Sequence, residues 1–248
     1  MKKQRSGTAA ERLRRMHELL AAAYGPQHWW PGEAPFEVIL GAYLTQNTSW
    51  KAVEGSLANL RVAGAFTVHG LRALPMDELR RAIQPSGFYT RKAPALKAFV
   101  AMLDEEYGGS VERMAEMPTA ELRMRLLALP GVGPETADAI LLYALNHAIP
   151  VADEYLRRIV ERHQLMEHPR GAKGYQALSD LTREAFADDK ESERASLFNE
   201  FHALTVAVGK AHCGRTPNCE GCPLAGDLNG SSVSESRQSR PGQRKLVK

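Results

Sequence analysis

Cysteine is scarce in this chain: three occur in 248 residues, and all lie between positions 213 and 222. A secreted disulfide framework needs several spaced pairs, so this pattern argues against one and favours a metal site in a reducing compartment. The chain also lacks an apolar run of membrane length, and no apolar stretch follows the polar residues 1–5. We therefore expect no membrane association, no signal peptide and a cytoplasmic location.

Alternating strand patterns are missing as well. Apolar residues instead recur at helical spacing, for example over 36–44 and 122–127, and proline and glycine fall between such runs. The sequence thus predicts an all-α fold. The last residues, 229–248, are rich in Ser, Gly, Arg and Gln and cannot build a core, which predicts a disordered basic tail.

A strong excess of positive charge is absent too. The net charge is +3, and residues 1–15 and 229–248 hold eleven Lys or Arg against two Glu. The interior of the chain is therefore mildly acidic overall. Charge alone is a weak argument for nucleic-acid binding, and any DNA contact must be a local patch.

What the chain does contain is the run Leu129-Pro130-Gly131-Val132-Gly133, followed by Pro134. The glycines permit a positive φ and remove side-chain bulk, and Pro134 suits the first position of a helix. Bare N–H groups at such a helix start can face an anion such as a DNA phosphate. The alternative is an ordinary turn between two helices.

Asp153 follows Gly133 by twenty residues and precedes a helical segment at 154–163. An aspartate there is also a good helix N-cap, which is the simpler explanation of the residue. Together, however, the run at 129–133 and Asp153 resemble the helix–hairpin–helix and catalytic aspartate of the endonuclease III superfamily of DNA base-excision glycosylases.

The resemblance implies roles for these residues. The hairpin residues Leu129, Gly131, Val132 and Gly133 would grip the backbone of damaged double-stranded DNA, and their carbonyls could hold a monovalent cation. Such backbone contacts position the protein without reading sequence. Asp153 would stabilise the positive charge that develops on the sugar and orient a water at C1′.

Glu135 occupies the position where bifunctional members of the superfamily carry a Schiff-base lysine. A carboxylate cannot form a Schiff base, and no lysine occurs between Lys92 and Lys173. The expectation is a monofunctional glycosylase without lyase activity. Glu135 can also favour the first helical turn electrostatically.

Aromatic motifs narrow the resemblance. The segments at 28–31 (His-Trp-Trp-Pro), 44–50 (Leu-Thr-Gln-Asn-Thr-Ser-Trp) and 85–89 (Pro-Ser-Gly-Phe-Tyr) resemble the endonuclease-III-like 3-methyladenine DNA glycosylases. Gln46 would enter the duplex, and Trp30, Pro31 and Trp50 would sandwich the flipped base, with cation–π attraction to a cationic purine. The alternative is that the tryptophans are core residues, which we favour for Trp29.

The three cysteines, Cys213, Cys219 and Cys222, resemble the loop that holds a [4Fe–4S] cluster in many endonuclease III relatives. The first gap is one residue short, and Leu228 stands where a fourth cysteine would fall. Asp227 is the candidate fourth ligand, with His212 less favoured because it adjoins Cys213. Zinc with one oxygen or nitrogen ligand, or no metal, are the alternatives.

We therefore expect a two-lobed helix–hairpin–helix glycosylase fold with a DNA-binding cleft. Residues 33–148 would form a six-helix lobe with the hairpin, and residues 1–32 and 149–228 a discontinuous second lobe. The expected protein is a bacterial, nucleoid-associated monomer that removes alkylated purines, chiefly 3-methyladenine, in base excision repair. The alternatives are a glycosylase for damaged or mismatched pyrimidines and a non-catalytic helix–hairpin–helix DNA-binding protein.

Overall fold

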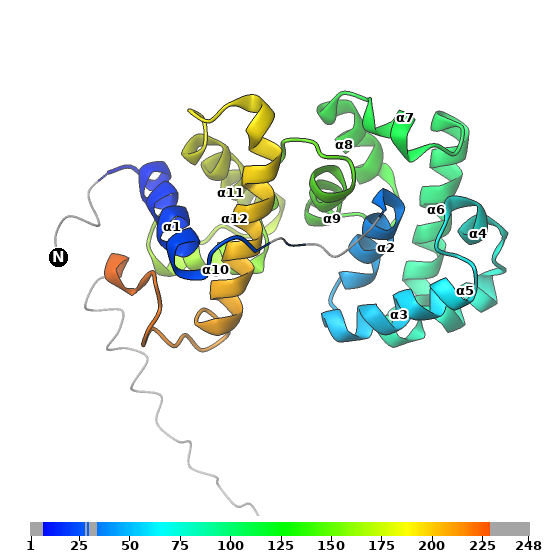
Figure 1. Ribbon diagram of the computed structural model, residues 1–248, viewed down its shortest axis with the longest axis horizontal. Coiled ribbons are helices and arrows are strands. Elements are labelled where there is room, and N and C mark those ends of the chain that lie inside the picture. The colour runs from blue at the N-terminus through cyan, green and yellow to red at the C-terminus, as the bar shows by residue number, and fades with distance from the viewer. Residues whose placement is uncertain (1–6, 28, 30–33, 229–248) are drawn as a thin grey trace, which may run out of the picture. The chain divides into compact units, whose positions relative to one another are not determined.

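A computed structural model of the chain describes residues 7–27, 29 and 34–228 (Figure 1). These residues form helices and loops and contain no β-strand, which confirms the predicted all-α class. Within the same residues, no helix combines the length and the hydrophobicity needed to span a membrane.

The described residues divide into two compact units. Unit 1 takes its residues from Met1–Gln27, Ala152–Asp188 and Glu200–Lys248, and unit 2 from His28–Val151 and Asp189–Asn199. The lobes expected at 33–148 and at 1–32 with 149–228 stay a prediction, as does the cleft between them. The segment Asp189–Asn199 belongs to the unit that contains the hairpin.

Unit 2 is a group of short helices with one longer helix, α6, which packs against α2, α4, α5 and α7 (Figure 1). Its core is formed by aromatic and aliphatic side chains such as Tyr43 and Phe99, whose ring centroids lie 5.9 Å apart. Its elements are α2 (Pro35–Thr45), α3 (Trp50–Val62), α4 (Val68–Ala73), α5 (Met76–Ala82), η2 (Gln84–Ser86), α6 (Tyr89–Tyr107), α7 (Val111–Ala115), α8 (Thr119–Ala128), α9 (Pro134–Ala139) and the π-helical turn η3 (Ile140–Ala144).

Helix α2 is the central element of unit 2. Eight of the nine residues at 36–44 are buried, and Glu37 is the exception. The helix is therefore covered on every side. It contacts α3, α6, α9 and η3. The loop that follows α2, at residues 46–49, is therefore fixed at its start by the most buried helix of the unit.

Unit 1 contains α1 (Ala9–Tyr24), α10 (Glu154–Arg162), α11 (Gly171–Ala185), the part of α12 (Glu191–Ala211) from Glu200 onward, and η4 (Ala225–Asp227). Helix α1 starts with a capping box between Thr8 and Glu11 and packs along α11. The absence of a side chain at Gly209 lets the ring of Tyr155 lie against α12, since a Cβ there would meet that ring at 2.2 Å. The two helices that carry Asp153 and His202 are thus closely packed.

A buried ion pair joins the two ends of unit 1. Arg12 on α1 donates through Nε and Nη2 to the carboxylate of Asp227, and both side chains are more than nine-tenths buried. Arg12 also donates to the carbonyl of His163 at 2.9 Å. Residues separated by more than two hundred positions in the chain are therefore held together by hydrogen-bonded charges.

Replacing Arg12 by Met should lower the free energy of unfolding by about 3 kcal/mol or more, because Asp227 would remain buried with an uncompensated charge. Urea denaturation followed by circular dichroism measures the effect. Arg183→Met is the matched control, since its ion pair with Asp180 is exposed and should contribute less than about 1 kcal/mol. Equal losses in both variants would contradict the assigned importance of the buried pair.

Candidate active site

The hairpin lies between α8 and α9. Gly131 has φ +76°, a left-handed conformation that favours glycine, whereas Gly133 has φ −97° and is the extended N-cap of α9. The sequence permits a positive φ at both glycines, but only Gly131 adopts one. At Gly133 a Cβ would meet no atom within 4 Å, so this backbone faces open space.

The hairpin presents unpaired donors on an anchored loop. Within the described residues, the N–H groups of Gly131 and Gly133 have no hydrogen-bond acceptor, and both glycines are exposed. The Val132 side chain is buried, and its N–H donates to the carbonyl of Leu129 at 3.3 Å. The loop is therefore held by its apolar residue while its free N–H groups can meet an anion.

Gln46 lies against this hairpin. Its Nε2 donates to the carbonyl of Gly131 at 3.1 Å and to Oγ1 of Thr136 at 3.0 Å. Two segments that are 85 residues apart in the sequence thus form one surface of unit 2. Nothing in the spacing of the motifs indicated this contact.

Lys92 fixes the loop that carries Gln46, and the sequence analysis missed it. Its Nζ donates at 2.8 Å to each of three acceptors: the carbonyls of Leu44 and Ser86 and Oγ1 of Thr48. Burial lowers the pKa of Lys92 to about 8. This buried ammonium therefore ties the end of α2 and the loop that follows it to the end of η2.

Phe88 is the second residue that sequence reasoning did not single out as functional. Its side chain is 57% exposed, and its φ of +47° is unusual for a non-glycine residue. The Lys92 ammonium lies 6.0 Å from the centre of the ring. The exposed ring of Phe88 thus lies near Lys92, the residue that fixes the Gln46 loop.

The expected base pocket is described in part. Trp30 and Pro31 lie outside the described residues. Trp50 is half-buried at the start of α3, and Trp29 packs edge-on against Tyr143 with centroids 6.0 Å apart. Glu135, at the position of the lyase lysine, is exposed in the first turn of α9.

The carboxylate of Asp153 is held at both of its oxygens. It is the N-cap of α10, where Oδ1 accepts from the Leu156 N–H at 2.8 Å. Its Oδ2 lies 3.5 Å from Nε2 of His202 on α12, and both side chains are at least nine-tenths buried. Capping therefore uses one oxygen of the carboxylate, and the second oxygen faces an imidazole.

His202 had no signal in the sequence, because it lies 49 positions from Asp153 and belongs to no motif. Leu204, two residues further on, stands where some 3-methyladenine glycosylases carry a modified lysine. Its side chain is fully buried in the core of unit 1. In this chain, His202 is thus the α12 residue within reach of the aspartate.

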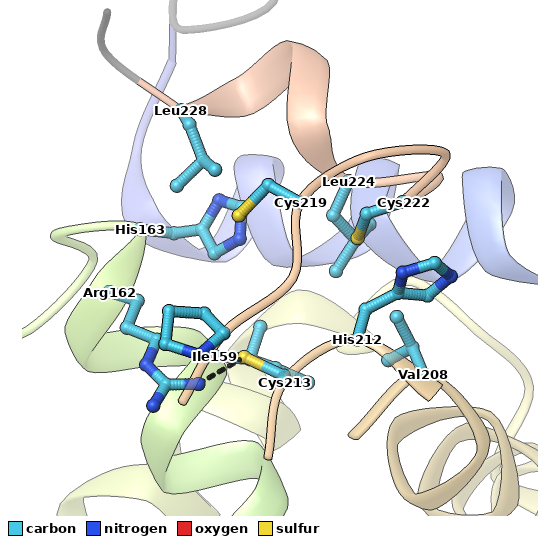
Figure 2. A pocket seen from close by; sticks show the side chains of 11 residues that line it. Ile159, Arg162, His163, Val208, His212, Cys213, Cys219, Cys222, Leu224 and Leu228 are labelled. Atoms are coloured by element: carbon cyan, nitrogen blue, oxygen red, sulfur yellow. Dashed lines mark hydrogen bonds between the residues drawn. The ribbon is translucent and has the colours of Figure 1, made fainter. Parts of the chain in front are cut away.

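The three cysteines line one cavity of about 150 Å³ in unit 1 (Figure 2). Two imidazoles, those of His163 and His212, lie on its wall with apolar side chains from α10 and α12. Arg162 donates to Sγ of Cys213 at 3.0 Å and to the carbonyl of Gly214 at 2.8 Å. The guanidinium of Arg162 therefore lies against the sulfur of Cys213 at this loop.

The surroundings of Cys219 and Cys222 favour the neutral thiol. Burial raises the pKa of Cys219 and of Cys222, and the neighbouring cysteines raise both further. Arg162 opposes this at Cys219, and backbone N–H groups of Leu224 and Ala225 oppose it at Cys222. A bound metal would supply the positive charge that thiolates at these positions need.

The carboxylate of Asp227, the predicted fourth ligand, has hydrogen-bond partners within the protein. This carboxylate does not line the cavity, and its oxygens are bound to Arg12 and to Nδ1 of His163, the latter at 3.0 Å. Burial would raise its pKa, but the hydrogen bonds from His163 and Arg12 outweigh burial and lower it. Three hydrogen bonds therefore engage both oxygens of this carboxylate, and the role of Asp227 as a metal ligand stays a prediction.

The residues at this cavity can be compared with the ligands of two kinds of metal centre. Among the described residues, no group of three or more His, Cys, Asp or Glu side chains is arranged to hold a metal ion. A [4Fe–4S] cluster presents a separate iron to each ligand, so its ligands surround a larger body. Three thiol groups around one cavity therefore suit a cluster better than a single zinc ion.

These features define a helix–hairpin–helix protein with an aspartate at the start of a later helix. Residues 40–184 match the family model described as HhH-GPD superfamily base excision DNA repair protein. The chain belongs to this superfamily and is a DNA glycosylase of the base excision repair family, as its motifs predicted.

Individual relatives agree with this assignment. The chain is 37% identical over 216 residues to a DNA repair glycosylase homologue of Methanocaldococcus jannaschii, with 86% of this chain and 94% of the relative covered. It is similar to the structure of the Helicobacter pylori 3-methyladenine DNA glycosylase bound to 1,N6-ethenoadenine, with 28% identity, a TM-score of 0.69 and coverage of 83% and 98%. An endonuclease III–DNA complex, at 22% identity and a TM-score of 0.72 over 92% and 99%, shows the fold alone.

Lys92→Met should reduce base release by about tenfold or more, because small displacements of positioning groups are costly in catalysis. Lys97→Met is the matched control: this lysine also lies on α6 and donates to three carbonyls, but these are in the segment 71–74, away from Gln46. Both variants should lose stability, so rates are compared at temperatures where each is fully folded. Equal rates in the two variants would contradict the role of Lys92 in the site.

Proposed function

We propose that the protein is a monofunctional glycosylase that hydrolyses the N-glycosidic bond of alkylated purines, such as 3-methyladenine, in duplex DNA. The observation that carries the catalytic part is the fixed carboxylate of Asp153 in a member of the HhH-GPD superfamily. The lesion class is supported by the likeness to the H. pylori enzyme, whose name specifies 3-methyladenine.

Asp153 acts on the sugar and the attacking water. As the glycosidic bond breaks, its electron pair leaves with the base, and positive charge develops at C1′ next to the carboxylate. The water oxygen then bonds to C1′, and its proton passes to Asp153. The Leu156 N–H and His202 hold the carboxylate in place, so that little reorganisation is needed.

An alkylated purine is cationic and leaves as a neutral base. It therefore needs little acid catalysis and gains from stacking on electron-rich rings, an effect of about 0.5–2 kcal/mol for each contact. Trp50 is the described candidate, and Trp30 and Pro31 complete the proposed pocket outside the described residues.

The DNA contacts are proposed on unit 2. The N–H groups of Gly131 and Gly133 would bind a phosphate, with Leu129 and Val132 shaping the hairpin and a monovalent cation held by its carbonyls. Gln46 and Phe88 would fill the space left by the flipped base, because an amide can pair with the orphaned base and an exposed ring can stack in the duplex. The cysteine loop of unit 1 would hold a [4Fe–4S] cluster with a structural role.

On duplexes that each contain one lesion, the protein should release 3-methyladenine faster than uracil or mismatched thymine. Asp153→Asn should lower release by about a thousandfold while DNA binding persists. Because asparagine also caps helices, this variant should keep its melting temperature, whereas Asp153→Ala should lose about 1 kcal/mol of stability as well.

The alternatives give different results on the same panel. Release of pyrimidine lesions alone would replace the proposed substrate class by the alternative one. Binding of every duplex without release of any base would leave a helix–hairpin–helix binding protein. Full activity of Asp153→Asn would limit Asp153 to helix capping.

The protein should leave the abasic strand uncut until alkali is added, and borohydride should trap no covalent complex with DNA. The reason is that Glu135 cannot form a Schiff base and that the nearby Lys92 is engaged with three acceptors. Gel electrophoresis of labelled duplex measures both outcomes. As a positive control, Glu135→Lys should gain measurable trapping, whereas efficient trapping by the wild type would contradict monofunctional chemistry.

A further inference from the structure

The imidazole of His163 faces the cysteine cavity. His163 directly follows α10, its side chain is 5% exposed, and it lines the cavity together with Cys213, Cys219 and Cys222 (Figure 2). No sequence motif contains it, because it lies fifty residues before the first cysteine. A nitrogen donor at the end of α10 thus lies on the wall of this cavity, together with the three cysteines and side chains of α10 and α12.

Its two ring nitrogens are in different environments. Nδ1 lies 3.0 Å from Oδ2 of Asp227, whose carboxylate is an acceptor held by Arg12. The N–H proton of the neutral ring therefore belongs on Nδ1, and Nε2 carries a lone pair. Within the described residues, Nε2 has no hydrogen-bond partner.

This arrangement is the one that metal-binding histidines use. A ligating imidazole almost always donates its other N–H to a carboxylate, a backbone carbonyl or a water, which fixes the ring and raises its basicity. Here the acceptor is the carboxylate of Asp227, which is fixed in turn by a bidentate arginine. The ring of His163 is therefore held in one orientation.

The competing donors fit less well. His212 also lines the cavity, and its Nδ1 lies 3.1 Å from the carbonyl of Asn218, so its ring is fixed in a comparable way. It is, however, partly exposed, and it directly precedes Cys213, which disfavours it as an additional ligand. Within the described residues the buried hydroxyl of Tyr24 has no hydrogen-bond partner, but Tyr24 does not line the cavity. Both oxygens of Asp227 accept hydrogen bonds, and Asp227 does not line the cavity either.

We propose that Nε2 of His163 is the fourth protein ligand of a [4Fe–4S] cluster held by Cys213, Cys219 and Cys222. Asp227 and Arg12 are its positioning residues. This inference rests on the proposed cluster and not on the lesion class. With His163 as a ligand, a loop with three cysteines can hold four irons. Asp227 then affects the cluster through His163 and does not contact it.

The test uses the full chain, produced with ample iron and purified without oxygen. After reduction with dithionite, pulsed electron paramagnetic resonance should detect hyperfine coupling to an imidazole nitrogen, and this coupling should change when histidine alone is labelled with ¹⁵N. The wild type needs no substitution for this measurement, so a folding defect cannot obscure it. No nitrogen coupling, or no iron at all, would overturn the proposal.

Two variants then identify the histidine. His163→Cys should retain about four irons per chain, lose the nitrogen coupling and have a lower reduction potential, because imidazole ligands raise the potential relative to thiolates. His212→Ala is the matched control from the same cavity wall and should keep the coupling. Loss of the coupling in His212→Ala, or its persistence in His163→Cys, would assign the ligand elsewhere.

Base release is measured on the same samples. A wild-type protein that releases bases but contains no cluster would overturn the ligand assignment and leave the glycosylase proposal standing. Conversely, a nitrogen-ligated cluster in a protein that releases no base would support the ligand assignment and contradict the proposed activity.

Discussion

The buried carboxylate of Asp227 is the constraint on which unit 1 depends. Removing a carboxylate from water is expensive, so it must be fully hydrogen-bonded. Arg12 from α1 and His163 from the end of α10 meet this requirement, and Asp227 itself lies in η4. These hydrogen bonds bring together three segments that are remote in sequence. They also hold His163, which lines the cysteine cavity.

An analogous device organises unit 2. Lys92 is a buried ammonium surrounded by two carbonyl oxygens and one hydroxyl oxygen, from the end of α2, from the end of η2 and from the loop after α2. Burial of a charge again demands partners, and here they come from both sides of the Gln46 loop. Helix α6 thereby fixes the part of the proposed DNA-binding surface that carries Gln46.

Asp153 caps a helix and also faces an imidazole. The helix N-terminus needs one acceptor, and the Leu156 N–H takes one oxygen. The other oxygen faces His202, which the close packing of α10 on α12 allows at Gly209. The helix cap therefore also holds this carboxylate, the proposed catalytic group, in a fixed orientation.

The sequence by itself determined the local features of this protein. Helical periodicity predicted the all-α class, Gly131 and Pro134 predicted the hairpin, Asp153 predicted the start of α10, and the motifs predicted the superfamily. These features depend on near neighbours, such as the φ of Gly131 or the cap at Leu156.

Only the tertiary structure decided which distant groups meet. Gln46 on the Gly131 carbonyl, His202 beside Asp153, and Asp227 bound to Arg12 and His163 are all contacts across more than forty residues. The prediction of Asp227 as a ligand used spacing from the cysteines alone, and it stays a prediction. Spacing could not show the partners of this buried carboxylate, because Arg12 and His163 come from segments that only folding brings to it.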